Sequence, residues 1–182
     1  MTLRGKIPFL AGLAVALGAG WAGFPLALYR SRPQPVDFSH RIHSEKAGAK
    51  CDDCHSFGED GSFRGVPTLD QCTGCHAAPM GTSAAEKNFI DRYVTPNREP
   101  QWGVYSRQPE NVSFSHAAHV KRGKLACETC HGQVGSSGAL AAAQADRISG
   151  YSRDVWNRMK MADCVACHRR NGLENSCLDC HK

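Results

Sequence analysis

Apolar residues gather at the start of this chain. The stretch Ile7–Tyr29 holds 23 residues without a charge. As a helix rising about 1.5 Å per residue it would cross a hydrocarbon core of about 30 Å. We therefore predict an N-terminal transmembrane helix over residues 1–30. Pro8 would lie in the first turn, where proline is tolerated, and Pro25 would kink or shorten the last turn.

A cleaved signal peptide is the alternative for this segment. Arg4 and Lys6 resemble a basic n-region, and the small residues Gly18 and Ala22 offer cleavage sites. The apolar run continues well beyond a normal h-region, which favours an uncleaved anchor.

Beyond residue 30 the pattern predicts little regular structure. Residues 31–37 contain two prolines and form an extended stalk before a single domain over 38–182. Residues 77–113 hold four prolines, which predicts an irregular connection. Helices are expected over 137–147, which is alanine-rich, and over 152–167, with a serine N-cap. The fold class is mostly α or irregular, with strands only as incidental pairs.

All ten cysteines fall in five Cys-x-x-Cys-His motifs. Cysteines three apart on a helical turn share a face, so both can form thioethers to one porphyrin while the next histidine reaches the iron. A zinc site would instead use a second cysteine pair or distant histidines, and thioethers would leave no thiol for disulfides. We predict five covalently bound haem c groups, each on a short helix. The attachment residues are Cys51, Cys54, Cys72, Cys75, Cys127, Cys130, Cys164, Cys167, Cys177 and Cys180, and the proximal iron ligands are His55, His76, His131, His168 and His181.

A second pattern is duplicated. Phe-Ser-His-x-x-His occupies residues 38–43 and again 114–119, and each copy is followed by a haem motif at the same spacing. Every matched position is offset by 76 residues, so the domain contains two repeat units that start at 38 and 114. We expect a short helix at each copy.

The remaining histidines all lie in these two copies. Nine histidines less the five proximal ones leave four, and each iron needs a ligand on its second face. Histidines three apart on a helix point the same way, so each copy should serve two different haems. The predicted distal ligands are His40, His43, His116 and His119.

One haem is left without a distal histidine. Met161, three residues before Cys164, is the first candidate, followed by Met159 and Met80. A methionine ligand would raise the potential of that haem above the bis-histidine ones. A five-coordinate or lysine-ligated iron is the alternative, and the sequence leaves open a further haem held without a complete motif.

The charge and the compartment follow from the haems. The formal charge is +5, but each ferric haem with two ionised propionates carries about −1, so we expect no nucleic-acid partner. Basic residues on both sides of the apolar stretch leave its orientation ambiguous. Covalent haem attachment occurs on the outer side of the bacterial cytoplasmic membrane, which predicts a single-pass anchor with the haem domain in the periplasm.

The repeat unit resembles the haem-binding unit of the small cytochromes c3 and c7. The full order of anchor, two repeat units, Met-x-x-Cys-x-x-Cys-His and a last motif resembles the multihaem subunit of the menaquinone reductase and alternative complex III group. The resemblance implies the distal ligands named above, including Met161. It also implies three partner subunits: a molybdopterin-oxidoreductase-like protein, an iron–sulfur protein and a polytopic quinone-binding membrane protein. Electrons would pass from periplasmic cytochrome c3 towards menaquinone in sulfate respiration, and this subunit would have no catalytic site of its own.

Other functions stay open at this point. Alternative complex III runs in the opposite direction, from quinol to a periplasmic acceptor. An anchored tetrahaem quinol dehydrogenase would carry a methionine two residues beyond a haem histidine, where this chain has Ala78. A haem enzyme would need a vacant iron site, and an independent membrane-tethered shuttle is the fourth possibility.

Overall fold

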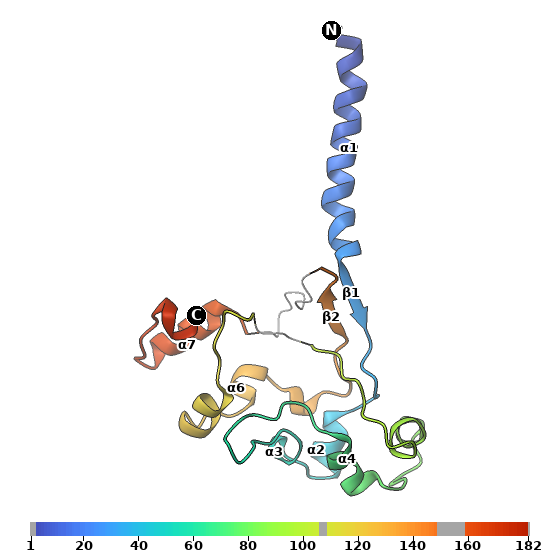
Figure 1. The fold of residues 1–182 in the computed structure, drawn as a ribbon, viewed down its shortest axis with the longest axis vertical. Coiled ribbons are helices and arrows are strands. Elements are labelled where there is room, and N and C mark those ends of the chain that lie inside the picture. The colour runs from blue at the N-terminus through green and yellow to red at the C-terminus, as the bar shows by residue number, and fades with distance from the viewer. Residues whose placement is uncertain (1–2, 106–108, 149–158, 182) are drawn as a thin grey trace.

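Helix α1 (Leu3–Leu28) accounts for the uncharged N-terminal run. In the computed structural model, which describes residues 3–105, 109–148 and 159–181, it projects alone from the rest of the chain (Figure 1). Residues Lys6–Leu28 are long and apolar enough to cross a membrane, and none of them is buried by the protein. Both prolines lie inside the helix, which continues for three residues past Pro25. The predicted helix is confirmed, and the described part of the chain leaves its apolar surface exposed.

A two-stranded sheet follows α1 directly. Strand β1 (Tyr29–Arg32) pairs antiparallel with β2 (Ala143–Asp146), with Tyr29 opposite Asp146 and Arg32 opposite Ala143. The helix expected over 137–147 is therefore wrong. Alanine's helix propensity is a weak preference, and pairing with the open edge of β1 satisfies the backbone of β2 instead.

The predicted stalk over 31–37 begins inside β1 and is attached to the domain. The Gln34 side chain donates to the carbonyls of Gly103 and Ala141 and accepts from the Gly103 N–H, at 3.0–3.2 Å. These bonds join it to segments about 70 and 107 positions away in sequence. Residues 31–32 are strand and residues 35–36 form a bend, so the segment is docked against the domain through Gln34 rather than free.

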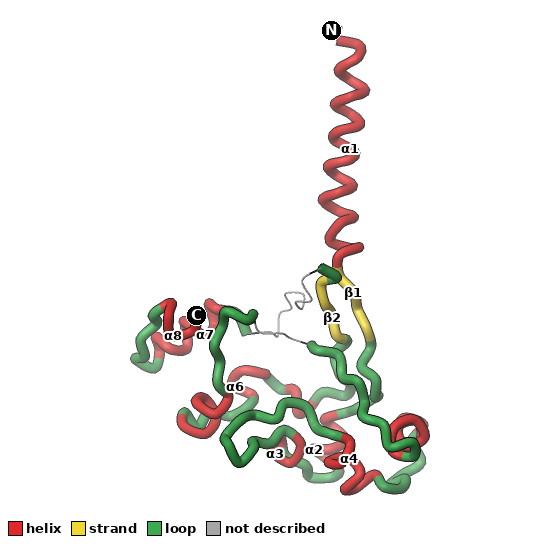
Figure 2. The backbone as a smooth tube through the Cα atoms, viewed as in Figure 1, coloured by secondary structure: helices red, strands yellow, loops and turns green. Residues whose placement is uncertain are grey.

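Every Cys-x-x-Cys-His motif carries a short helix, as predicted. In four of them a carboxylate or amide accepts from the backbone N–H three residues earlier, the reciprocal half of a capping box that stabilises so short a helix. The helices are α3 (Cys51–Cys54), α4 (Leu69–His76), α6 (Glu128–His131), α7 (Met161–Arg170) and α8 (Cys177–Cys180). Figure 2 shows these segments separated by long loops, with strand only at β1 and β2.

Helix α7 is shorter than the sequence predicted. It begins at Met161, and Met159 and Lys160 are not helical, so a continuous helix over 152–167 is wrong at these two positions. The predicted serine N-cap of that helix lies outside the described residues. Lys160 takes the N-cap position, and its N–H donates to Asp163 at 2.9 Å.

The two Phe-Ser-His-x-x-His copies are helical, as predicted, and are built alike. The first forms α2 (His40–Lys46), and the second leads into the π-helix η2 (Ala117–Arg122). In both, the serine hydroxyl accepts from the N–H three residues on, at 3.2–3.3 Å. This capping hydrogen bond explains why serine precedes the first histidine in each copy.

The connection expected to be irregular over 77–113 contains a helix. Helix α5 (Ala84–Phe89) continues into the π-helix η1 (Ile90–Val94). The four prolines of this region lie outside 84–94, and Ser83 caps α5 by accepting from the Glu86 N–H at 3.1 Å. The proline content of the whole connection does not reveal that its segment 84–94 contains no proline.

The apolar interior is small. Leu69 of α4 packs with Phe89 and Tyr93, and the Tyr93 hydroxyl donates to the Pro35 carbonyl at 3.0 Å. Among the described residues the buried apolar side chains are these three and Ala143. A further turn, η3 (Val134–Ser136), packs against α2. The polypeptide alone supplies little core, in agreement with a domain organised around cofactors.

Candidate haem-binding sites

Eight histidines form four ring pairs. Each pair joins one histidine of a Phe-Ser-His-x-x-His copy to one motif histidine. The ring centroids lie 6.5 Å apart for His40–His55, 6.0 Å for His43–His76, 6.4 Å for His116–His131 and 6.2 Å for His119–His168. The sequence predicted that each copy serves two motifs, and the structure brings the side chains together in that way.

These separations fit an iron between two imidazoles. Metal–imidazole bonds are about 2.0 Å long, which places two ligand ring centroids on opposite sides of one metal roughly 6 Å apart. Direct ring stacking would bring them closer, as Phe63 and His116 do at 4.2 Å. The four pairs therefore leave a metal-sized space between their rings.

Hydrogen bonds at Nδ1 orient these rings. His43 and His119 share this contact with the carbonyl of the serine four residues earlier, each at 2.8 Å. His55 contacts the Gly65 carbonyl at 2.7 Å, and His76 contacts the Glu86 carboxylate at 2.8 Å. A donor bond from Nδ1 fixes the tautomer in which Nε2 is free to bind a metal.

Phenylalanine also positions the histidines of the two repeat copies, a role that the sequence alone did not indicate. Phe38 stacks on His43 at 4.3 Å, and Phe114 stacks on His119 at 4.6 Å. Each also meets the first histidine of its copy edge-on. The signal was present in the sequence, because phenylalanine opens both copies of the repeat.

Burial keeps the first histidine of each copy neutral. It lowers the pKa of His40 and of His116, and the neighbouring histidines lower it further. Neutral imidazole is the form that binds a metal.

The cysteines show which motifs are neighbours. Four cysteines have a thiol pKa that is raised most by burial and next by the charge of a cysteine from another motif, which must therefore lie nearby. The pairs are Cys72 with Cys54, Cys51 with Cys127, Cys130 with Cys167, and Cys164 with Cys180. The motifs thus follow one another in space in the order second, first, third, fourth, fifth.

Other contacts agree with this order. The ring of Phe63 lies between His55 of the first motif and His116, the partner of the third, at 6.5 and 4.2 Å. At the other end the Ser113 N–H donates to the Cys180 carbonyl at 2.7 Å, and Val112 pairs with His181. The last motif is thereby held against the start of the second repeat.

His181 is the exception among the motif histidines. In the part of the chain that the structure describes, no second histidine ring lies beside it. Met161 begins α7 and is 71% exposed. It shares a helix face with Cys164, and Cys164 neighbours Cys180 of the last motif. Met161 is thus an exposed side chain one turn before a cysteine that neighbours the fifth motif.

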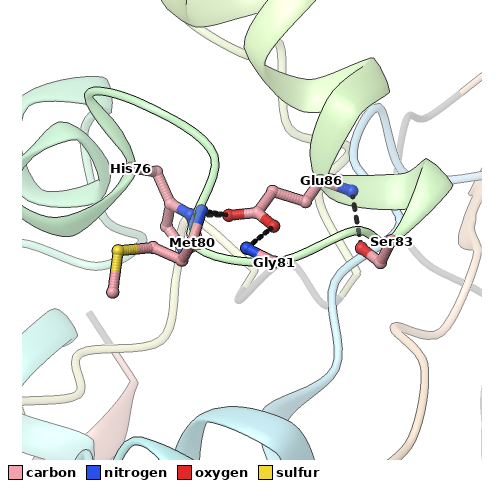
Figure 3. Close-up of polar contacts among 5 residues, drawn as sticks. All are labelled: His76, Met80, Gly81, Ser83 and Glu86. Atoms are coloured by element: carbon pink, nitrogen blue, oxygen red, sulfur yellow. Dashed lines mark hydrogen bonds and ion pairs between the residues drawn. The ribbon is translucent and has the colours of Figure 1, made fainter.

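The other methionine candidates have weaker positions. Met80 lies in the loop after His76 (Figure 3). His76 already has a histidine partner, His43. Met159 is partly covered, at 38% exposure, and precedes α7.

Two family models match separate halves of the chain. The class III cytochrome c family matches residues 25–101, and the family described as cytochrome c7 and related cytochromes c matches residues 112–182. The second match begins just before the second repeat. Together they establish covalently bound haem c as the cofactor class.

A curated relative matches nearly the whole chain. It is the menaquinone reductase multihaem cytochrome c subunit of Nitratidesulfovibrio vulgaris, 40% identical in an alignment 193 positions long that covers 98% of this chain and 90% of the relative. The haem motifs, the histidine pairs, the two family models and this relative all indicate a multihaem cytochrome c. The chain belongs to the family of multihaem cytochrome c subunits of menaquinone reductase.

Proposed function

We propose that this chain is the electron conduit of a membrane menaquinone reductase. It carries five haem c groups and passes electrons from a periplasmic cytochrome c3 towards menaquinone in sulfate respiration. The observation that carries the proposal is the set of four histidine pairs, each with one motif histidine and spaced for one iron. Two strong axial ligands leave no vacant position for substrate, which favours electron transfer over chemistry at the iron.

The proposed ligand sets follow the ring pairs. His40 and His55 serve the first haem, His43 and His76 the second, His116 and His131 the third, and His119 and His168 the fourth. His181 and Met161 serve the fifth. Met161 is favoured because it is exposed and lies one turn before Cys164, beside the last motif.

The haems form one series in the order second, first, third, fourth, fifth. The contacts of Phe63 with His55 and His116 support the link between the two repeats, and the cysteine neighbours support every link. A series with two distinct ends suits a subunit that accepts electrons at one end and delivers them at the other.

The proposed setting is the periplasmic face of the cytoplasmic membrane, with α1 as an uncleaved anchor. The exposed apolar helix supports it. The partners are a molybdopterin-oxidoreductase-like subunit, an iron–sulfur subunit and a polytopic quinone-binding subunit. The curated relative, named as one subunit of a menaquinone reductase, supports a multi-subunit assembly.

Extraction of the native complex tests this function. The chain is purified in mild detergent through a C-terminal tag, and all co-purifying proteins are identified by mass spectrometry. We expect the three partner subunits. Recovery of the chain alone would contradict the subunit role and leave a tethered shuttle or an independent quinol dehydrogenase.

A further inference from the structure

One motif histidine has a carboxylate behind it. The His76 Nδ1 lies 2.8 Å from Glu86 Oε1 (Figure 3). The Nδ1 atoms of His43, His55 and His119 contact backbone carbonyls, and that of His40 contacts the Ser137 hydroxyl. Among the described residues, His76 is the histidine whose ring meets a negative charge.

The Glu86 carboxylate is held in place. Oε1 also accepts from the Met80 N–H at 2.7 Å, and Oε2 accepts from the Gly81 N–H at 2.9 Å. Ser83 caps the helix that carries Glu86, and the Glu86 side chain is 12% exposed. Three contacts, from His76 and from the Met80 and Gly81 N–H groups, thus orient both oxygens of the Glu86 carboxylate.

A carboxylate at this position acts on the metal through the imidazole. It draws the Nδ1 proton, makes Nε2 a more basic ligand, and adds a negative charge near the iron. Both effects favour the ferric state over the ferrous state, which carries one positive charge less.

We infer that Glu86 is a positioning and tuning residue that lowers the reduction potential of the haem at Cys72, Cys75 and His76. This inference rests on the proposed ligation of iron by His76 and His43. The second motif stands at one end of the proposed series, so its haem is set to exchange electrons with a strongly reducing one-electron partner. Glu86 lies at the second motif, so it should not affect the potential of the haem at the fifth motif, at the other end of the series.

The test uses a spectroscopic property of the same haem. The His43 and His76 rings are inclined by 60°, whereas the other pairs are inclined by 7–23°. Strongly inclined axial imidazoles give a ferric low-spin EPR signal of large gmax, distinct from the rhombic signals of near-parallel ligands. An EPR-monitored redox titration of the purified full-length protein therefore follows this haem separately.

Two results are expected. In the unsubstituted protein the large-gmax signal titrates at a lower potential than the rhombic signals. In Glu86→Gln, the ratio of reduced to oxidised haem at a fixed potential rises about tenfold for the haem that gives the large-gmax signal. This corresponds to a shift of about 59 mV for one electron. The potentials of the rhombic signals stay unchanged. E86A is the second variant should E86Q lose haem.

Two matched controls separate the Glu86 contact from the loss of any carboxylate. Asp91→Asn removes a carboxylate of η1, directly after α5, that pairs with Lys87 rather than with a histidine, so it should leave the potential unchanged. Glu174→Gln removes an exposed carboxylate between α7 and α8 and should leave the large-gmax signal unchanged. An equal shift in Asp91→Asn and Glu86→Gln would mean that the contact with His76 is not the cause and would overturn the inference.

The other outcomes are equally decisive. A full haem complement with an unmoved potential in Glu86→Gln, or a large-gmax signal that titrates above the rhombic ones in the unsubstituted protein, overturns the inference and leaves the proposed function intact. Survival of the large-gmax signal in His76→Ala would instead contradict the proposed ligation itself.

Discussion

The relative tilt of the axial histidine rings differs among the sites. It is 60° for His43 and His76 and 7° for His116 and His131. Phe38 and Phe114 stack on the second histidine of their copies in the same way, so the repeat alone does not produce the difference. The Glu86 contact at Nδ1 of His76 is what distinguishes the tilted site.

The tilt predicts the EPR spectrum. The oxidised protein should show one large-gmax signal and three rhombic bis-histidine signals. Continuous-wave EPR with spin quantitation measures this ratio. Four equal rhombic signals would contradict the ring geometry.

Met161 gives a second prediction at this scale. Met161→Ala should abolish the near-infrared charge-transfer band of a histidine–methionine haem and alter one low-spin EPR signal, because His181 loses its second ligand. Met159→Ala, two residues away, is the matched control and should leave both spectra unchanged. An unchanged spectrum in Met161→Ala would remove this residue from the proposed ligands.

Each Phe-Ser-His-x-x-His copy is proposed to hold ligands of two haems, so its two histidines should be separable. His43→Ala should convert about one-fifth of the haem to high spin with loss of the large-gmax signal. His40→Ala, in the same copy, should cause the same conversion with loss of a rhombic signal. Electronic absorption and EPR report both changes, and identical losses in the two variants would refute the pairing.

Helices α4 and α5 and the π-helix η1 share the one apolar cluster. Leu69 is 2% exposed, so Leu69→Ala should lower the free energy of unfolding by about 2–5 kcal/mol. Ile148→Ala, at a position 80% exposed, should change it by less than about 0.5 kcal/mol. Thermal unfolding of the haem-loaded protein measures both; equal effects would mean that this cluster is not a structural core.

Local patterns predicted the elements with local causes. The motif helices and α2 depend on capping groups a few residues away, which the sequence displays. Strand β2 depends on β1, more than 100 positions earlier, and alanine content carries no record of that pairing. The Glu86 contact was missed because ten residues separate it from His76 at no recognised motif spacing. Counting the histidines predicted a set of ligands, but only the fold could show which histidine rings pair.

At the scale of the whole molecule, the protein is an apolar helix joined to a domain with little core of its own. Leu69, Phe89, Tyr93 and Ala143 are the buried apolar residues of the described chain, too few to offset the ordering of so many loop residues. Haem groups attached through ten cysteines would supply the missing apolar surface and restrict the unfolded chain as disulfides do. Fold and electron transfer then depend on the same covalent bonds.

The intact mass of the chain, purified from membranes in mild detergent, tests the central claim most directly. We predict a single species whose mass includes five haem groups and the N-terminal helix α1 (Leu3–Leu28). A mass with fewer than five haems would contradict the pentahaem conduit, and a mass without the first thirty residues would contradict the anchor.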